Sequence, residues 1–541
     1  MNVKADEFVE SQTVIRATSE MRDPPPAEQS ALVRAHIQPA RTPLRARVKG
    51  TEVGSRAMFA SLPAALRSSA RRREARLALE RALVGASSPA SRGPTHARIL
   101  PPSRGYAAGV ARERTAVTTR LWQARLEAAR AAGVDTKDAA TKSQDALVPK
   151  PPVRTSVRYA FNADDDLLES YRNPWNAVRM GRVLEDLDSL AGNIAFQHCD
   201  DADRSTRPQL LVTASVDRVR LLRQLRLDQD CVLSGAVAWT GRSSMVIRME
   251  AWPANHPDAP SNPQHAASNE HTPSSSSSLS ADAYARGSGP SLSADFTFVA
   301  RDPLTNRAAA LNPLVPDTPE TRALFEETAR RVERKKRRAK TLAAGDAGLS
   351  ESLAADKASF VEERARRARS LSELPALAPP DVISVAATLC ENIFVAQPQQ
   401  RNLSGRIFGG FLLRRAFELA FATTYVFGGA RPHFKQVSDM NFLKPVDVGD
   451  LLRFRARVLD ANAAADDARP CVDVEVEALV TKPEEGSSEV SNTFMFKFYV
   501  GGADEARVAR TPLPATREEA AHVWERCRRP KLDPAVMYDE A

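Results

Sequence analysis

The sequence predicts an α+β fold of two tandem repeats, each with a long central helix wrapped by a curved antiparallel sheet. One helix-like stretch, residues 409–427, is apolar nearly all round and is interrupted only by Arg414, Arg415 and Glu418. Such a helix is buried, and this one is too short and too interrupted to span a membrane. Both halves of the chain also carry the same order of elements, which indicates two copies of one structural unit.

The first repeat is expected over residues 155–315. Its helix pattern covers residues 181–196, and strand-like segments follow at 209–222, 231–240, 243–252 and 294–302. Residues 253–293 are rich in Ser, Pro and Asn and show no apolar periodicity, so they form a low-complexity insertion. An insertion between two strands costs least at the tip of a hairpin, and we place it there.

The second repeat is expected over residues 379–505, after a charged, helix-prone linker over residues 316–378 that the sequence PALAPP ends. Its helix is the apolar stretch described above, and its strand-like segments lie at 383–397, 433–461, 471–482 and 492–500. The third of these segments alternates with a period of two, as half-buried strands do. Residues 506–541 are predicted to be a C-terminal tail.

Residues 1–150 are rich in Arg, Ala, Ser and Pro and carry few aromatic side chains, so we expect a disordered basic tail. Within it, the sequence MFASLPAALRSSARRR, which begins at Met58, contains no acidic residue and has the composition of a mitochondrial presequence. Its internal position means that translation starts at Met58 or that the signal is cryptic. The mitochondrial matrix is therefore the predicted location, and a basic tail without a targeting role is the alternative.

The composition excludes several classes of protein. The net charge of +9 raises the question of nucleic-acid binding, but the basic residues are not interleaved with aromatic side chains that would stack on bases. The five cysteines are widely scattered and form no CxxC pair, which argues against a zinc cage or a disulfide framework and fits a reducing compartment. No run of ~18 apolar residues predicts a membrane span.

Several motifs resemble the tandem hotdog-domain acyl-CoA thioesterases, with the mitochondrial acyl-CoA thioesterase 9 family as the nearest type. They are RVLEDLDSLAG and WTGRSSM in the first repeat and GRIFGGF and FLKPVDVGD in the second. The resemblance covers residues 155–315 and 375–505. It implies two hotdog domains, hydrolysis of acyl-CoA to a free fatty acid and coenzyme A, an active site between the domains, and a homo-oligomer that is a trimer of double hotdogs.

Asp188 is the candidate catalytic acid. In a helix with ~100° per residue, Val183, Leu187 and Ala191 share an apolar face, and Asp188 lies at its rim. Asp186 lies nearly opposite and is expected to be solvated. A carboxylate pressed against apolar side chains is suited to act as a tuned base. The resemblance implies the same residue, because in this family one domain contributes an Asp from its helix and the other an Asn from the loop before its helix.

The motif N-x-x-G-x-x-x-G-G matches Asn402, Gly409 and Gly410. The resemblance places Asn402 in the active site, where it would position the water or the thioester carbonyl. Asp188 would activate the water, and backbone N–H groups of the two glycines, at a helix N-terminus, would polarise the thioester oxygen. The alternatives are an Asx turn at Asn402, close packing at the glycines, and a capping or interface acid at Asp188.

The repeat predicts a second, degenerate site. Asn173 precedes Asp188 by fifteen residues, and Asn402 precedes Phe417 by fifteen residues. The place of the catalytic acid in the second helix is therefore taken by Phe417, with Glu418 next to it. Because Phe cannot transfer a proton, we expect an active Asp188–Asn402 site and an inactive Asn173–Phe417 site, unless Glu418 can swing in.

Contacts with coenzyme A are expected at TGRSSM, which resembles a strand of the family that lies near the coenzyme A phosphates. The candidates are Arg242, Ser243 and Ser244, because a planar guanidinium suits phosphate; a turn arginine in solvent is the alternative. The basic run 334–338 could also meet a phosphate, although a solvated helix face is the simpler interpretation. No metal site is predicted, and no cofactor beyond the coenzyme A of the substrate.

Two other functions were weighed against thioester hydrolysis. A hydratase on this fold needs a His beside an Asp, and the histidines of the expected cores, His198 and His433, suggest no such pair. A non-catalytic acyl-CoA-binding or assembly module with a degenerate site is the other alternative. The presence of both Asp188 and Asn402 argues against it.

Overall fold

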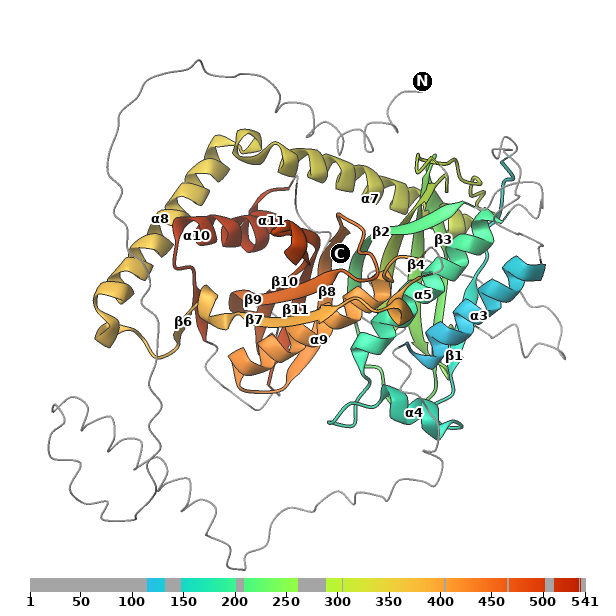
Figure 1. Ribbon diagram of the computed structural model, residues 1–541, viewed down its shortest axis with the longest axis horizontal. Helices are drawn as coiled ribbons and strands as arrows, with labels where there is room; N and C mark the ends of the chain where they lie inside the picture. Colours follow the sequence, from blue (N-terminus) through green and yellow to red (C-terminus); the bar gives the residue numbers. More distant parts are fainter. Residues whose placement is uncertain are drawn as a thin grey trace, which may run out of the picture. The chain divides into compact units, whose positions relative to one another are not determined.

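The computed structural model describes residues 114–131, 147–200, 209–260, 289–303, 305–402, 405–464, 467–501, 510–534 and 536 of the 541-residue chain (Figure 1). The predictions for residues 1–113, including the presequence-like stretch from Met58, lie outside these residues. Most of the Ser-rich insertion lies outside them as well. In the part of the chain that is described, no helix is long and apolar enough to cross a membrane.

Ten strands form one antiparallel sheet, with the order β1-β3-β4-β5-β2-β8-β11-β10-β9-β7. The first repeat supplies β1 (Thr155–Tyr159), β2 (Leu210–Leu221), β3 (Cys231–Thr240), β4 (Ser244–Pro253) and β5 (Leu292–Arg301). The second supplies β7 (Cys390–Val395), β8 (Pro432–Phe442), β9 (Leu451–Ala464), β10 (Asp467–Lys482) and β11 (Ser487–Val500). Most strands lie within or close to the predicted segments, but β1 was not predicted, and the segment 433–461 contains two strands, β8 and β9. The insertion connects β4 and β5, which pair with each other, as predicted.

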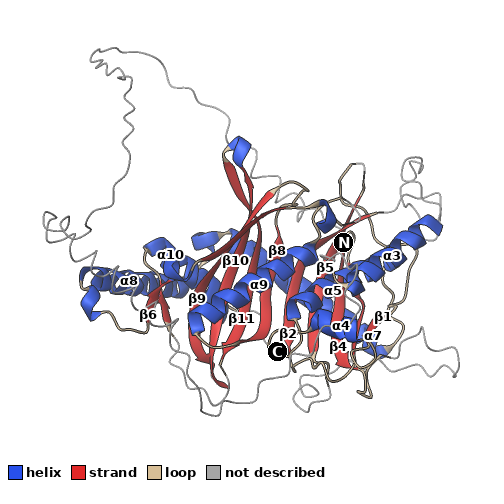
Figure 2. Cartoon of the chain, turned by 60° about the horizontal axis from the view of Figure 1, so that its bottom comes forward, coloured by secondary structure: helices blue, strands red, loops and turns tan. Residues whose placement is uncertain are grey.

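The two halves join through strands β2 and β8, which pair antiparallel in the middle of the sheet. The central helices α5 (Met180–Cys199) and α9 (Gly409–Gly428) lie on the same face of the sheet and pack against each other (Figure 2). Helix α9 therefore has strands on one side and α5 on another. This explains its lack of a polar face, and twelve of its twenty residues are buried. The predicted fold, two long helices each wrapped by an antiparallel sheet, is confirmed.

The opposite face of the sheet is also covered by helices. Side chains of β10 alternate, so that Val474 and Val476 face α9 while Glu475 faces away from it. Glu475 is nevertheless 2% exposed, because helix α10 (Arg517–Val523) and the turn after it bring His522 and Arg526 to its carboxylate, at 2.7 and 2.9 Å. The predicted C-terminal tail is therefore wrong in this part: α10, a π-helical turn and α11 (Arg529–Leu532) pack on the sheet.

The linker is helical, as predicted, and forms α7 (Pro319–Ala343) and α8 (Glu351–Glu373). Helix α7 is fixed to the first half, where Arg331 contacts Asp295 at 2.8 Å and Lys335 contacts Asp217 at 2.6 Å. Helix α8 is fixed to the C-terminal helices through Asp356, which accepts hydrogen bonds from Trp524 and Arg528. The short strands β6 (Val382–Ser384) and β12 (Thr511–Leu513) pair with each other in parallel.

The N-terminal region is not disordered up to residue 150, contrary to our prediction. Helix α3 (Ala116–Ala131) packs along α5, with Val117, Leu121 and Trp122 buried in the main core. The short helix α4 (Asp165–Tyr171) follows β1 and buries Tyr171 completely. Helix α3 has a weakly apolar, Arg-rich sequence, and it is held by the surface it covers rather than by its own propensity.

Candidate active site

Asp188 lies in the middle of α5 with its carboxylate turned into the protein. It is 2% exposed. Its Oδ1 accepts a hydrogen bond from the Thr213 hydroxyl on β2, at 3.0 Å. Its Oδ2 is shielded from solvent and has no hydrogen-bond partner of normal geometry. The Thr213 hydroxyl thus orients one oxygen of the carboxylate.

The N-terminus of α9 meets the other oxygen, Oδ2. A Cβ added to Gly409 would lie 3.1 Å from Asp188 Oδ2 and 2.9 Å from a ring carbon of Phe442. A Cβ on Gly410 would lie 2.9 Å from the Glu185 carbonyl oxygen. Both glycines are therefore required by the close approach of α9 to α5. The N–H groups of the first turn of a helix have no intrahelical acceptor, and the Gly410 N–H faces the Asp188 carboxylate.

Burial raises the pKa of Asp188 from its usual range to about 6. Three groups oppose this shift: the Thr213 hydroxyl, the Gly410 backbone N–H and the positive charge of Arg125 on α3. The Gly410 N–H faces the carboxylate and favours its charged form, as the dipole at a helix N-terminus does. A carboxylate with a pKa near neutrality can accept a proton from water and remain largely ionised at pH 7.

The loops before α5 and α9 share equivalent hydrogen bonds and an equivalent isolated β-bridge. In the second repeat, Asn402 Oδ1 accepts the Arg406 N–H at 3.1 Å, and Arg401 and Ile407 form an isolated β-bridge. In the first, Asn173 Oδ1 accepts the Ala177 N–H at 2.9 Å, and the bridge joins the equivalent residues. Asn402 thus forms the turn that we gave as its alternative role. Its carboxamide oxygen accepts a hydrogen bond within the loop.

The second pseudo-site is filled by aromatic rings. Phe417, which stands where Asp188 stands in α5, is buried and lies 5.3 Å from Phe434 and 5.7 Å from Phe498 between ring centroids. Phe434 takes the place of Thr213, since Thr213 pairs with Phe298 on β5 and Phe434 with Phe498 on β11. Both the acid and its hydroxyl partner are therefore replaced by Phe. The sequence pattern alone indicated only the first replacement.

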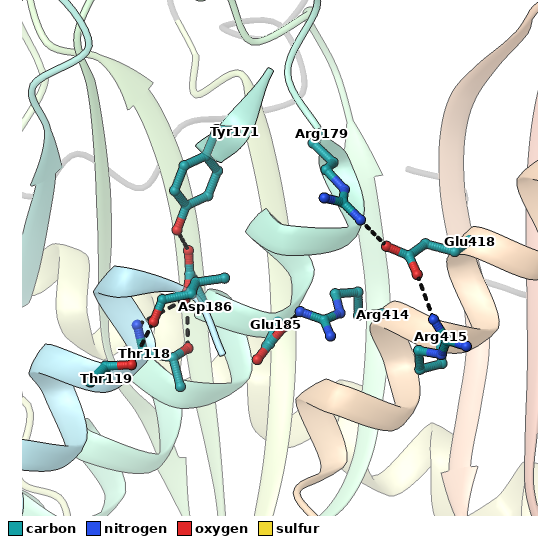
Figure 3. A network of polar contacts seen from close by, with 10 residues as sticks. Thr118, Thr119, Tyr171, Arg179, Glu185, Asp186, Arg414, Arg415 and Glu418 are labelled. Atoms are coloured by element: carbon teal, nitrogen blue, oxygen red, sulfur yellow. Dashed lines mark hydrogen bonds and ion pairs between the residues drawn. The ribbon is translucent and has the colours of Figure 1, made fainter. Parts of the chain in front are cut away.

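Glu418, the acid beside Phe417, is engaged elsewhere. Its carboxylate contacts Arg179 at 2.8 Å and Arg415 at 3.4 Å (Figure 3). Arg179 precedes α5, so this pair links the start of α5 to the middle of α9. Because Glu418 is paired with these two arginines, it is not a free acid that could replace Phe417 in proton transfer.

A buried ion pair joins the two helices between the two pseudo-sites. Glu185 and Arg414 each stand twelve residues after the equivalent Asn, and their side chains meet at 2.7 Å (Figure 3). They are 0% and 8% exposed. Burial raises the pKa of Glu185 to about 7, while the Arg414 charge lowers it. Two equivalent residues that contact each other lie on the pseudo-twofold axis, which passes between α5 and α9.

Asp186 is buried, contrary to our expectation that it is solvated. Its carboxylate accepts hydrogen bonds from the hydroxyls of Thr115, Thr118, Tyr159 and Tyr171. Figure 3 shows Thr118 and Tyr171 beside it. Burial raises its pKa, and these four hydroxyls oppose the shift. The helical-wheel argument failed here because it left this side of α5 open, whereas α3, β1 and α4 cover it. With both oxygens satisfied by the protein, Asp186 is suited to holding α3 in place.

The residues proposed for coenzyme A lie at the same end of the sheet as Thr213. Met245 on β4 pairs with Phe298 on β5, and Phe298 pairs with Thr213 on β2. The turn that contains Arg242 and Ser243 directly precedes β4, and Arg242 is exposed there. The basic run 334–338 lies on α7, on the opposite face of the sheet, where Lys335 contacts Ser215 and Asp217. That location disfavours a role for the run in binding substrate at Asp188.

Among the residues that the structure describes, no histidine hydrogen-bonds to Asp188. His198 Nε2 lies 2.8 Å from the Asn312 carbonyl oxygen, and His433 lies 3.5 Å from Gln224. Our sequence analysis overlooked His522, which belongs to an ordered core and pairs with Glu475 on the outer face of the sheet. Among the described residues, no group of three or more His, Cys, Asp or Glu side chains could hold a metal ion.

Comparison with known proteins assigns this arrangement to a family. Residues 180–259, from α5 into the turn after β4, match the thioesterase superfamily. The mitochondrial acyl-coenzyme A thioesterase 4 of Humulus lupulus is 42% identical over 78% of this chain and 75% of its own length. The chain belongs to the acyl-CoA thioesterase family. The resemblance noted in the motifs is thereby confirmed.

Two further relatives match similarly large shares of the chain. The chloroplastic acyl-coenzyme A thioesterase 2 of Humulus lupulus is 42% identical over 76% of this chain and 87% of its own length. The mitochondrial acyl-coenzyme A thioesterase 9 of Homo sapiens is 31% identical over 66% of this chain and 74% of its own length. The matches therefore extend well beyond one repeat.

Proposed function

We propose that this thioesterase hydrolyses acyl-CoA to a free fatty acid and coenzyme A at one site per chain, between the two repeats. Asp188 takes a proton from a water molecule, whose oxygen attacks the thioester carbon. The negative charge that develops on the carbonyl oxygen is stabilised by backbone N–H groups at Gly409 or Gly410. The C–S bond then breaks, and the thiolate of coenzyme A leaves and takes up the proton.

One observation carries this proposal: Asp188 is buried at the start of a helix from the other repeat, and the Thr213 hydroxyl orients one oxygen of its carboxylate. Asn402 is proposed to position the thioester carbonyl through its NH2 group. Arg242, Ser243 and Ser244 are proposed to contact the coenzyme A phosphates from the end of the sheet. The Asn173–Phe417 site, including Glu418, is proposed to be inactive because its interior is aromatic.

The test is release of free coenzyme A from a panel of short to long acyl-CoAs by the full chain and by two variants. Asp188→Asn is expected to lose at least about 100-fold of the wild-type rate, as removal of a general base does. Phe417→Ala is expected to keep releasing coenzyme A, although the substitution weakens the packing of the protein core. Full activity in Asp188→Asn would contradict the assignment. Binding of acyl-CoA without turnover by the folded wild type would instead support the non-catalytic alternative.

We also propose that the chain forms a trimer of double hotdogs. The sheet ends at β7, whose outer residues Ile393 and Val395 are 55% and 46% exposed, so an apolar edge is available for assembly. Light scattering after size exclusion should give three times the chain mass of 59.0 kDa. A mass of one chain would contradict this.

The proposed location is the mitochondrial matrix. Two of the relatives described above are named mitochondrial, and one is named chloroplastic. A fluorescent protein fused behind residues 1–150 should enter mitochondria, and a fusion that starts at Met58 tests whether that start suffices. Accumulation in another compartment would contradict the proposal.

A further inference from the structure

Arg125 on α3 is a charged residue that the proposed chemistry does not yet use. Its guanidinium lies on α5 one turn beyond Asp188, where Gly192 has no side chain. A Cβ on Gly192 would lie 2.9 Å from Arg125 Nη2. On its other side, the guanidinium lies 5.9 Å from the ring centroid of Phe196. The site for Arg125 therefore depends on a glycine in the middle of a helix, which otherwise weakens helices.

This guanidinium has no ion-pair partner among the described residues. Its Nε is shielded from solvent and makes no hydrogen bond. Burial lowers the pKa of Arg125 to about 10, and the nearby charge of Asp188 opposes that shift. The two side chains thus interact through their charges, without the direct contact of an ion pair. A charge in this position favours the ionised carboxylate and leaves its oxygens available.

The other elements around Asp188 contribute no charge. Strand β2 supplies the Thr213 hydroxyl, β8 places the Phe442 ring nearby, and α9 supplies the glycine backbone. On α5 itself, Glu185 is paired with Arg414. The charge that acts on Asp188 within the described part of the chain is that of Arg125.

The second pseudo-site lacks this arrangement. Counted from Asn173 and Asn402, the position of Gly192 in α5 is that of Phe421 in α9. The Phe421 ring packs against Phe417 and against Trp175, at centroid distances of 6.4 and 5.6 Å. Where the catalytic acid is replaced by Phe, the small residue that admits an arginine is replaced as well.

We infer that Arg125 is a positioning residue of the thioesterase site, whose charge holds Asp188 in its ionised form without pairing with it. The inference rests on the proposed role of Asp188 as the base. It makes α3, from the region before the first repeat, a part of the active site. Two contacts fix α3 on α5. Trp122 donates a hydrogen bond to Ser189 at 3.1 Å, and the Thr118 hydroxyl donates one to Asp186.

The test compares Arg125→Met, Arg125→Lys and, as a matched control on the exposed side of the same helix, Arg120→Met, all in the full chain. Loss of the positive charge is expected to move the acid limb of kcat/KM upward by about one pH unit. Arg125→Met should then be about five-fold slower than wild type at pH 6 and nearly equal to it at pH 8.5. Arg125→Lys and Arg120→Met should keep the wild-type limb.

The inference would be overturned if Arg125→Met lost the same factor in kcat/KM at pH 6 and at pH 8.5. It would also be overturned if Arg125→Met and Arg120→Met had the same pH profile of kcat/KM. A second measurement does not depend on turnover. The difference in unfolding free energy between Asp188 and Asp188→Asn is followed against pH, in the wild-type and Arg125→Met backgrounds. Its midpoint should lie at higher pH without Arg125, and an unchanged midpoint would overturn the inference. A wild type that releases no coenzyme A refutes the proposed function, while this titration still decides on Arg125.

Discussion

At the scale of single residues, Asp188 joins a functional advantage to a cost in stability. Its pKa in the folded protein is about 6, raised by burial from the usual 3.8. Ionisation is therefore harder in the folded than in the unfolded chain. The unfolding free energy falls through this group as the pH rises from about 4 to about 6, and the full cost remains above that range. Below about pH 4 the group is protonated in both states and contributes no difference.

The first prediction follows from this loss of unfolding free energy when Asp188 ionises. At pH 7, Asp188→Asn should be more stable than wild type by on the order of 2–3 kcal/mol, because the amide keeps the shape without the buried charge. At pH 4 the two proteins should have the same stability. Denaturant unfolding at both pH values measures the difference. A variant that is less stable than wild type at pH 7 would show that the carboxylate is better solvated than its burial indicates.

The second prediction concerns Thr213, whose hydroxyl orients the carboxylate. Thr213→Val removes the hydrogen bond to Oδ1 and raises the pKa of Asp188 further, so kcat/KM at pH 7 should fall about ten-fold. Thr297→Val on the neighbouring strand β5 is the control, because Thr297 lies between Phe296 and Phe298 on the opposite face. Equal rates in the two variants would exclude an orienting role.

The sequence indicates Asp188 as a candidate acid but does not reveal its surroundings. The resemblance implies an Asp in this helix, and Asp188 lies at the rim of an apolar helix face, which is a local property of the sequence. Asp186 was misjudged and Thr213 was missed because the partners of both come from distant segments. Thr213 lies in a strand whose alternation is regular, and a threonine there is ordinary. A second sequence signal existed in Gly192, a glycine in the middle of a buried helix.

At the scale of secondary-structure elements, α3 shows that the folded part of the protein starts before the first repeat. The helix and Thr115, which precedes it, supply two hydroxyls to Asp186, and the helix adds the Trp122 donor to Ser189 and the Arg125 charge near Asp188. Its sequence is polar and rich in arginine, so composition alone indicated a disordered region. Its fold depends on the surface of α5, which a single-sequence pattern does not reveal.

The third prediction compares a chain that begins at residue 110 with one that begins at residue 150. The shorter chain lacks α3, which leaves Asp186 with two of its four hydroxyl donors and removes the cover from α5. We expect it to melt at a lower temperature and to hydrolyse acyl-CoA at least ten-fold more slowly. Both chains lack residues 1–109, so a difference between them belongs to the segment 110–149. Equal rates would mean that α3 is dispensable.

At the scale of the whole molecule, the two repeats contribute different parts of the proposed site. The first repeat contributes Asp188 and Thr213, the segment before it adds the cover of α3, and the second repeat contributes the glycine N-terminus of α9. The pseudo-twofold axis carries Glu185 on one side and Arg414 on the other. Pairing a half with a second copy of itself would place two buried like charges on that axis, which is strongly unfavourable. The ion pair thus selects the unlike pairing that completes the site.

The fourth prediction divides the chain in the turn between α7 and α8, where each linker helix stays with the half it covers. Fragments 110–346 and 347–541 should each be inactive alone, because the acid and the helix N-terminus lie on different fragments. Each would also expose β2 or β8, the strands that join the halves. Coexpression should restore coenzyme A release and a co-eluting complex. Arg414→Glu in the second fragment should abolish this recovery, and Glu185→Arg in the first should restore it. Hydrolysis by either fragment alone would show that the site does not require both repeats.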